Sequence, residues 1–339
     1  MKKLFLLFLT TLLISCGSSE IDFNKDSTFE EVVNQAKAEK KPLFVEIMAS
    51  DCHICLALEP HLKDSEVAKI YNTNFINYKI DIKDPIQYNL LKNFKVNFTG
   101  TPTLLILNPE NFELIGGSIV NETENGKNAL IETANFYLKY GDLNKLSNDL
   151  KNYSKEELLT LAELSRLGYK DELAAISFKE FAKGLSEEQM ISEEYMDIMG
   201  RVMISVDNDY FEYFLNHYQE YIEKYGPMRV QPVAEYILQN AINSKNAENY
   251  SREDLNRIIL GLEKLGTSQD DITRRMWMVE TSYLFKNNQD KKALEILNKT
   301  IKLMDSKPDE RIYAYLCDYV KNRTSNPETL NYINKNWCK

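Results

Sequence analysis

Two cysteines separated by two residues are the side chains in this sequence best suited to chemistry. The motif Cys52-His53-Ile54-Cys55 follows an apolar run of strand length and begins a stretch with helical spacing. A thiol at a helix start lies beside unpaired backbone N–H groups and the positive end of the helix dipole, which both stabilise a thiolate. A thiolate attacks disulfides, and a second nearby thiol resolves the mixed disulfide that forms. The motif therefore predicts thiol–disulfide exchange, with Cys52 attacking and Cys55 resolving.

The residues around the first cysteine predict opposing effects on its reactivity. A protonated His53 would stabilise the thiolate of Cys52, whereas the carboxylate of Asp51 would disfavour it. Ile54 completes the pair of residues between the two thiols and adds no charge. The motif therefore leaves open whether client disulfides are reduced, formed or isomerised.

Strands and helices alternate around this motif. The spacing of apolar residues predicts helices over 28–41, 53–71, 86–94 and 128–140, and strands over 43–49, 75–82, 103–107 and 113–120. The run at 43–49 is continuously apolar apart from Glu46, as in a central strand that is covered on both faces. We therefore expect a compact α/β domain over residues 27–141.

The remainder of the chain, residues 142–339, has a different character. Strand-like runs disappear and helical spacing continues, with breaks near Gly184, Gly226-Pro227, Gly266 and Pro308. Residues 283–308 resemble a tetratricopeptide repeat, but no clear second copy is evident, and Thr281 replaces the usual glycine. We expect an all-helical domain, either an irregular bundle or a repeat-like array.

Composition argues against nucleic acid as a partner. The chain has 339 residues, of which 43% are hydrophobic, so it can form packed cores. It carries 51 acidic against 41 basic side chains and a net charge of −10. A protein that binds phosphate backbones usually presents a basic surface, which this composition does not favour.

The N-terminus has the features of a bacterial export signal. Lys2 and Lys3 precede an apolar run over residues 4–15, whose helix of about 18 Å is shorter than the ~30 Å core of a bilayer. Its end, Leu13-Ile14-Ser15-Cys16, resembles a lipobox, which implies acylation of Cys16. We expect a signal peptide over 1–15, a lipidated tether over 16–26 and a place in the bacterial envelope. Gly17 favours the outer membrane, and the protein would face the periplasm.

Three further features make the N-terminal domain resemble the thioredoxin superfamily. Glu46 lies six residues before Cys52, at the place of the family's buried acid. Pro60 matches the proline that kinks the active-site helix, and Thr101-Pro102 resembles the cis-proline loop. The sequence departs from the family at Asp51, where a Trp is usual.

The resemblance implies a fold, an activity and roles for these residues. It implies a central mixed sheet flanked by helices, and exchange at cysteines without a cofactor. Glu46 would relay a proton for the second cysteine, while Thr101 and Pro102 would form the edge that binds client proteins. The partners would be proteins with cysteines or disulfides and an upstream redox partner, and the resemblance to envelope reductases favours reduction.

Several alternatives remain open at this point. Glu46 would be a solvated residue if its strand lay at an edge of the sheet. Cys317 and Cys338 would form either a structural disulfide or a second redox pair. A zinc site on the CxxC motif would need more ligands, and the next cysteine is distant, so we expect no metal. The alternative function is a non-catalytic lipoprotein adaptor, in which the helical domain binds a partner and the thioredoxin unit serves as scaffold or redox sensor.

Overall fold

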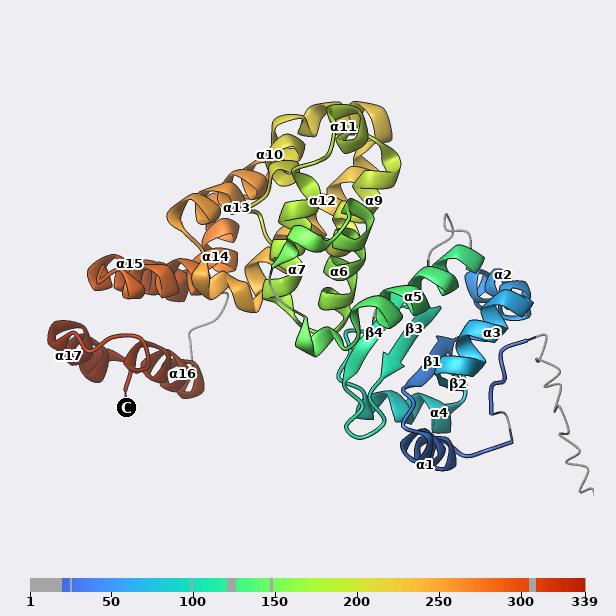
Figure 1. Ribbon diagram of the computed structural model, residues 1–339. Helices are drawn as coiled ribbons and strands as arrows, with labels where there is room; N and C mark the ends of the chain where they lie inside the picture. The colour runs from blue at the N-terminus through green and yellow to red at the C-terminus, as the bar shows by residue number, and fades with distance from the viewer. Residues whose placement is uncertain are drawn as a thin grey trace, which may run out of the picture. The chain divides into compact units, whose positions relative to one another are not determined.

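The computed structural model describes residues 20–24, 26–98, 100–120, 126–146, 149–304 and 309–338. The predicted signal peptide and the predicted lipidation site at Cys16 lie outside these residues. The chain divides into two compact units, with the division after Leu146. In the described residues, the first unit combines a sheet with helices and the second is all-helical (Figure 1), which confirms the predicted fold class.

A mixed sheet of four strands, in the order β2-β1-β3-β4, forms the centre of the first unit (Figure 1). The central strand β1 (Leu43–Met48) is parallel to β2 (Ile76–Asp81) and antiparallel to β3 (Thr103–Leu107). The outer strand β4 (Leu114–Ile119) is antiparallel to β3. Every residue of β1 before Met48 is buried, as expected for a strand with neighbours on both sides.

Helices cover both faces of this sheet. Helix α1 (Phe29–Glu39) packs on one face, and α2 (His53–Leu62), α3 (Ser65–Asn74) and α5 (Gly126–Tyr140) share an apolar cluster on the other. Helix α4 (Pro85–Leu90) and a 3-10 turn, η1 (Leu91–Asn93), follow β2. The helix that follows β1 and carries the cysteines therefore packs on the sheet beside α3 and α5.

The helix expected over residues 53–71 is two helices in the structure. Asp64 separates them, because its carboxylate accepts hydrogen bonds from the backbone N–H groups of Glu66 at 2.9 Å and Val67 at 3.3 Å. Such a side-chain cap begins a new helix, here α3. Apolar spacing continues across the break, so periodicity alone did not reveal it. Pro60 lies inside α2, near its C-terminal end.

Both ends of the first unit differ from the boundaries expected from the sequence. Residues of the expected tether pack on the sheet, since Ile21 and Phe23 are buried and Phe23 forms a bridge with Asn77 of β2. Beyond α5, a 3-10 turn, η2 (Leu143–Lys145), also belongs to this unit. The side-chain amide of Asn144 donates to the carbonyl of Leu114 in β4 at 3.0 Å, which fixes the turn to the sheet.

The second unit is built from consecutive helices that pack through apolar clusters. Among the described residues, one cluster lies among the helices from α6 to α14, another joins α14 to α17, and a small one contains Ala174, Ala175 and Ile204. The helices are α6 (Lys155–Leu167), α7 (Asp171–Ala182), α8 (Glu187–Met190), α9 (Glu193–Val202), α10 (Asp209–Asn216), α11 (Tyr218–Tyr225), α12 (Pro227–Asn243), α13 (Arg252–Lys264), α14 (Gln269–Lys286), α15 (Asp290–Lys302), α16 (Glu310–Lys321) and α17 (Pro327–Asn336), with 3-10 turns η3 (Leu150–Asn152) and η4 (Lys245–Asn249).

Two hairpins of this unit, α6–α7 and α14–α15, share one turn geometry. In the first, the N–H of Lys170 donates to the carbonyl of Ser165 at 2.8 Å, and in the second the N–H of Gln289 donates to Leu284 at 2.8 Å. The residue before the donor is left-handed in both, with φ of 55° at Tyr169 and 54° at Asn288. The same turn also ends α13, where the N–H of Thr267 donates to the carbonyl of Leu262 at 3.0 Å, so it is a common helix C-terminal motif and does not by itself indicate a repeat.

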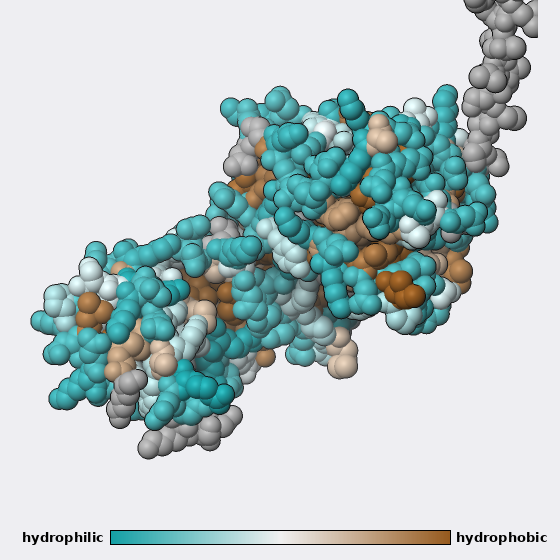
Figure 2. Space-filling view, turned by 90° about the horizontal axis from the view of Figure 1, so that it is seen from below, coloured by the Kyte–Doolittle hydropathy of each residue, from teal (hydrophilic) through white to brown (hydrophobic). Residues whose placement is uncertain are grey.

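Cys317 and Cys338 form a disulfide within the cluster of α14 to α17. It joins α16 to the residues after α17, closing a loop whose crosslink stabilises the fold by about 3 kcal/mol in the chain-entropy model. We find no helix in the described ranges whose length and apolarity would let it cross a membrane. Hydrophilic residues cover most of the face that Figure 2 shows, in keeping with the acidic composition.

Candidate functional site

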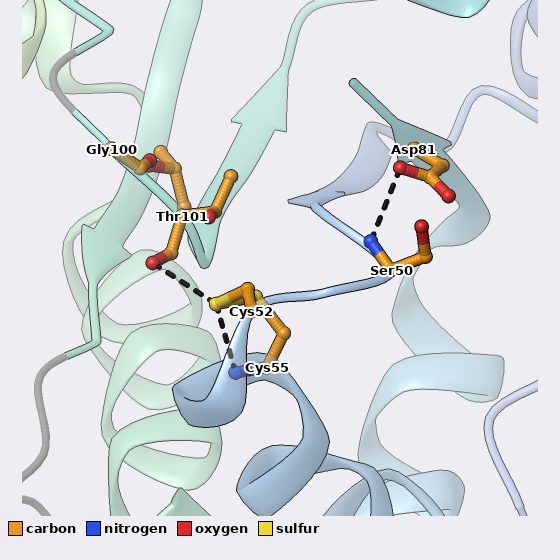
Figure 3. The surroundings of a disulfide bond; sticks show 7 residues. Ser50, Cys52, Cys55, Asp81, Gly100 and Thr101 are labelled. Carbon is orange, nitrogen blue, oxygen red and sulfur yellow. Dashed lines mark hydrogen bonds between the residues drawn. A yellow bond between two sulfur atoms is a disulfide. The ribbon is translucent and has the colours of Figure 1, made fainter. Parts of the chain in front are cut away.

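The end of β1 delivers Cys52 to the N-cap position of α2. Its backbone is extended, with φ −84° and ψ 116°, and its sulfur accepts a hydrogen bond from the N–H of Cys55 at 3.2 Å (Figure 3). The first N–H groups of a helix have no carbonyl partner within it, so a sulfur at this position replaces one. A negative charge on Cys52 would therefore be stabilised both by this hydrogen bond and by the helix dipole.

The two cysteines differ in their access to solvent. They form a disulfide in the structure, in which Cys52 is half-buried and Cys55 is only 1% exposed. Cys52 is therefore more accessible from solvent than Cys55. His53 is exposed and Ile54 half-buried in the first turn of α2. The arrangement gives the pair the unequal access that attacking and resolving thiols need.

The loop before β3 lies against the first cysteine. The carbonyl oxygen of Thr101 is 3.5 Å from the Sγ of Cys52 (Figure 3), and the Thr101-Pro102 peptide bond is cis. The hydroxyl of Thr103 donates to the carbonyl of Gly100 at 2.6 Å, which fixes the turn. Thr101 is half-buried and Pro102 is buried. The structure therefore brings together the motif and the loop that lies about fifty residues after it in the sequence.

A lysine that sequence reasoning missed accompanies Asp51. The Nζ of Lys83 lies 2.7 Å from its carboxylate, and both side chains are more than half exposed. Asp81 holds the two segments together, since its carboxylate accepts from the N–H groups of Ser50 at 3.3 Å (Figure 3) and of Lys83 at 2.9 Å. The pairing with Lys83 lowers the pKa of Asp51. Asp51 is therefore ionised beside the motif, with its charge partly offset by Lys83.

Glu46 is buried in the central strand, so the solvated alternative is wrong. Its side chain is fully buried, two residues after Phe44, which packs in the cluster of α2, α3 and α5. Because successive side chains of a strand alternate between faces, Glu46 faces these same helices. Burial raises the pKa of Glu46 to about 7, although the neighbouring charge of Lys79 opposes the shift. An acid with this pKa exchanges protons near neutral pH.

Lys79 and Glu59 form ion pairs that connect the buried Glu46 to the surface of the domain. Lys79 lies beside Glu46 in the parallel register of β1 and β2, and its Nζ is 3.1 Å from Oε2 of Glu46. The same ammonium donates a hydrogen bond to Glu59 of α2 at 2.5 Å. Sequence reasoning missed both residues. Glu46 and Lys79 are each the fourth residue of their strands, β1 and β2, so an in-register parallel pairing of these strands would have predicted that the two side chains are neighbours.

Comparison with known families agrees with this geometry. Residues 24–109 match the family described as Thioredoxin-like. This part of the chain is a thioredoxin-like domain. The matched residues contain the CxxC disulfide, Glu46 and the Thr101-Pro102 loop. The match ends after β3, and the helical region that follows lies outside it. Among curated proteins, none matches the chain.

The second cysteine pair belongs to the helical unit and lies far from the CxxC motif in the sequence. Cys317 is buried and Cys338 half-buried, and both lie in the apolar cluster of α14 to α17 in the helical unit. In the part of the chain that the structure describes, no three His, Cys, Asp or Glu side chains are grouped as metal ligands.

Replacing Asp51 tests how its charge affects the first cysteine. In Asp51→Asn the reduced protein should react with iodoacetamide about threefold faster at pH 6, because a like charge is removed while Lys83 remains. The measurement is the pH dependence of alkylation at Cys52. Asp22→Asn removes the same charge at an exposed position outside the motif and should leave the rate unchanged. A slower or equal rate in Asp51→Asn would show that the carboxylate does not act on the thiol.

Replacing Glu46 tests the cost of its burial. The folded pKa of about 7 lies above the ordinary value of 4.5. Its contribution to stability is therefore present below pH 4.5 and is lost as pH rises through 7. Relative to wild type, Glu46→Gln should gain roughly 2 to 3 kcal/mol of unfolding free energy between pH 5 and pH 8. Urea unfolding at both pH values measures this, with the exposed Glu30→Gln as control. A gain independent of pH would contradict the assignment.

Proposed function

We propose that this protein is a membrane-tethered thiol–disulfide oxidoreductase of the bacterial envelope, acting on the cysteines of client proteins. The observation that carries the proposal is the Cys52–Cys55 disulfide at the start of α2, with one sulfur accessible and the other buried. Its position in a thioredoxin-like domain and beside the Thr101 carbonyl supports the same activity.

The reaction runs in the reducing direction in two steps. The thiolate of Cys52 attacks a client disulfide, forms a mixed disulfide and releases one client thiolate. Cys55 then loses its proton to Glu46 and attacks Cys52, which releases the second client thiolate and leaves the Cys52–Cys55 disulfide. Two electrons pass from the cysteine pair to the client. An upstream dithiol partner must return two electrons before the next cycle.

The loop before β3 provides the edge on which a client lies. The carbonyl of Thr101 is next to the reacting sulfur, and the buried Pro102 holds the loop against the domain. A client in extended conformation can pair its backbone with this loop while its disulfide meets Cys52. The helical unit selects the clients or the redox partner.

A lipid on Cys16 would hold the protein at the membrane. The supporting observation is the lipobox-like Leu13-Ile14-Ser15-Cys16 that follows the apolar run. Several acyl chains, each contributing about 0.8 kcal/mol per buried methylene, anchor a protein without a spanning helix. Gly17 after the acylated cysteine favours the outer membrane, facing the periplasm.

Insulin reduction tests the enzymatic activity. The chain starting at Ser18 retains every described residue, and with dithiothreitol as electron donor it should accelerate insulin precipitation at least tenfold. Cys52→Ser should abolish the acceleration, and Cys55→Ser should accumulate mixed disulfides with clients, because only the resolving step is lost. The double variant Cys317→Ser/Cys338→Ser serves as control and should keep the activity, since that pair lies in the helical unit.

Two outcomes of this experiment would change the conclusion. If the folded wild type and Cys52→Ser are equally inactive, the protein is instead an adaptor with a retained thioredoxin-like scaffold. If the protein is active, equilibration of the pair with glutathione decides the direction. A potential near about −270 mV fits a reductant and one near about −120 mV an oxidant.

The lipid anchor is tested separately from the activity. Expressed in a bacterium with lipoprotein processing, the wild-type chain should incorporate labelled palmitate and sediment with membranes, because acylation supplies its anchor. Cys16→Ser should incorporate no label and leave the outer-membrane fraction. Equal labelling of both proteins would refute acylation at Cys16, and Cys317→Ser is the matched single-cysteine control.

A further inference from the structure

Three charged groups form a row from the interior of the thioredoxin-like domain to its surface. They are Glu46 of β1, Lys79 of β2 and Glu59 of α2, with side chains that are 0%, 22% and 34% exposed. The ammonium of Lys79 lies between the two carboxylates, 3.1 Å from Glu46 and 2.5 Å from Glu59. It also lies over the ring of Phe23, 4.9 Å from its centroid, which confines it from the side of the N-terminal segment.

The lysine is bound more closely by the outer carboxylate than by the inner one. It donates a hydrogen bond to Glu59 at 2.5 Å, whereas it lies 3.1 Å from Oε2 of Glu46 in an ion pair. Glu59 therefore holds the ammonium of Lys79 closer to itself than to Glu46. It also adds a like charge that disfavours ionisation of Glu46.

The other polar groups around Glu46 do not replace this lysine. Tyr71 of α3 is fully buried near it, but its hydroxyl donates to the carbonyl of Leu130 at 2.8 Å. Among the described residues, the charged groups that act on Glu46 are Lys79 and Glu59. Burial raises the pKa of Glu46, the charge of Lys79 lowers it, and Glu59 works against Lys79. Burial alone would lower the pKa of Lys79, but the two carboxylates together raise it, so it keeps its charge.

We propose that Glu59 is a positioning residue for disulfide exchange, which holds Lys79 partly away from Glu46 and so keeps the buried acid able to accept and return a proton. This inference rests on the proposed function. Without Glu59, the ammonium would turn fully to Glu46, which would then be ionised down to a lower pH and would accept the proton of Cys55 less readily.

The proton transfer that Glu59 influences is balanced within the resolving step. The S–H bond of Cys55 breaks and its proton passes to the Glu46 carboxylate, while the Cys55 sulfur attacks Cys52 of the mixed disulfide. The Cys52–Cys55 bond forms, the bond to the client sulfur breaks, and the client leaves as a thiolate that is protonated by water. Glu46 returns its proton when the pair is next reduced and Cys55 leaves as a thiolate. The electrons come from the cysteine pair and go to the client.

The test is the pH dependence of the resolving step in Glu59→Gln. Reduced protein starting at Ser18 is mixed with oxidised glutathione at rising concentration, quenched with acid, and its mixed and internal disulfides are counted by mass spectrometry. The rate at saturating glutathione reports the attack of Cys55.

In wild type this rate should rise with pH around a midpoint near the Glu46 pKa of about 7. In Glu59→Gln the midpoint should fall by about half to one pH unit. Glu59→Asp keeps the charge and should restore most of the wild-type profile.

A matched control is available at the start of α3. There, Lys127 also lies between two carboxylates, 2.9 Å from Asp64 and 2.9 Å from Glu66, but apart from β1. Glu66→Gln should therefore leave the midpoint unchanged. If Glu59→Gln and Glu59→Asp both keep the wild-type midpoint while Glu46→Gln loses it, the role of Glu59 is refuted and the proposed function stands. If wild type forms no internal disulfide from glutathione, the proposed function itself fails.

Discussion

The site depends on one constraint, which is that the chain leaves the central strand and starts a helix at Cys52. The N–H of Cys55 needs an acceptor at that point, and the sulfur of Cys52 provides it. This hydrogen bond fixes the sulfur at the helix end, where the dipole favours a thiolate. Cys55 lies three residues further along, in the first turn of the same helix, and is buried in the interior of the domain. Reactivity and unequal access therefore have one structural cause.

Local signals in the sequence were enough to predict most of the fold and part of the site. The continuous apolar run around Glu46 predicted a central strand, and the structure buries Glu46 there. The CxxC motif at the strand–helix junction was predicted from its neighbours in sequence. In contrast, Lys79, Lys83 and Glu59 became visible only when strand register and helix packing were known, because no periodicity links them to the cysteines.

Turns explain the remaining differences. Asp64 divides one helical pattern into two helices through side-chain hydrogen bonds that apolar spacing does not encode. The hairpins α6–α7 and α14–α15 share a backbone turn although its left-handed residue is Tyr169 in one and Asn288 in the other. Asparagine adopts this conformation more readily than tyrosine, so the second hairpin carries the more recognisable signal. A comparison of the sequence with itself does not detect a backbone conformation that is formed by different residues.

The charges around the cysteines show how burial changes the electrostatic effect of an ion pair. The strand β2 and the residues just after it supply a lysine to each nearby acid, Lys79 to Glu46 and Lys83 to Asp51. The outer pair is more than half exposed, so water and salt screen it, and we expect it to change the reactivity of the Cys52 thiol only modestly. The inner acid is fully buried, so a small displacement of Lys79 changes its proton affinity strongly. One segment therefore supplies a solvent-screened charge near Cys52 and a desolvated charge beside Glu46.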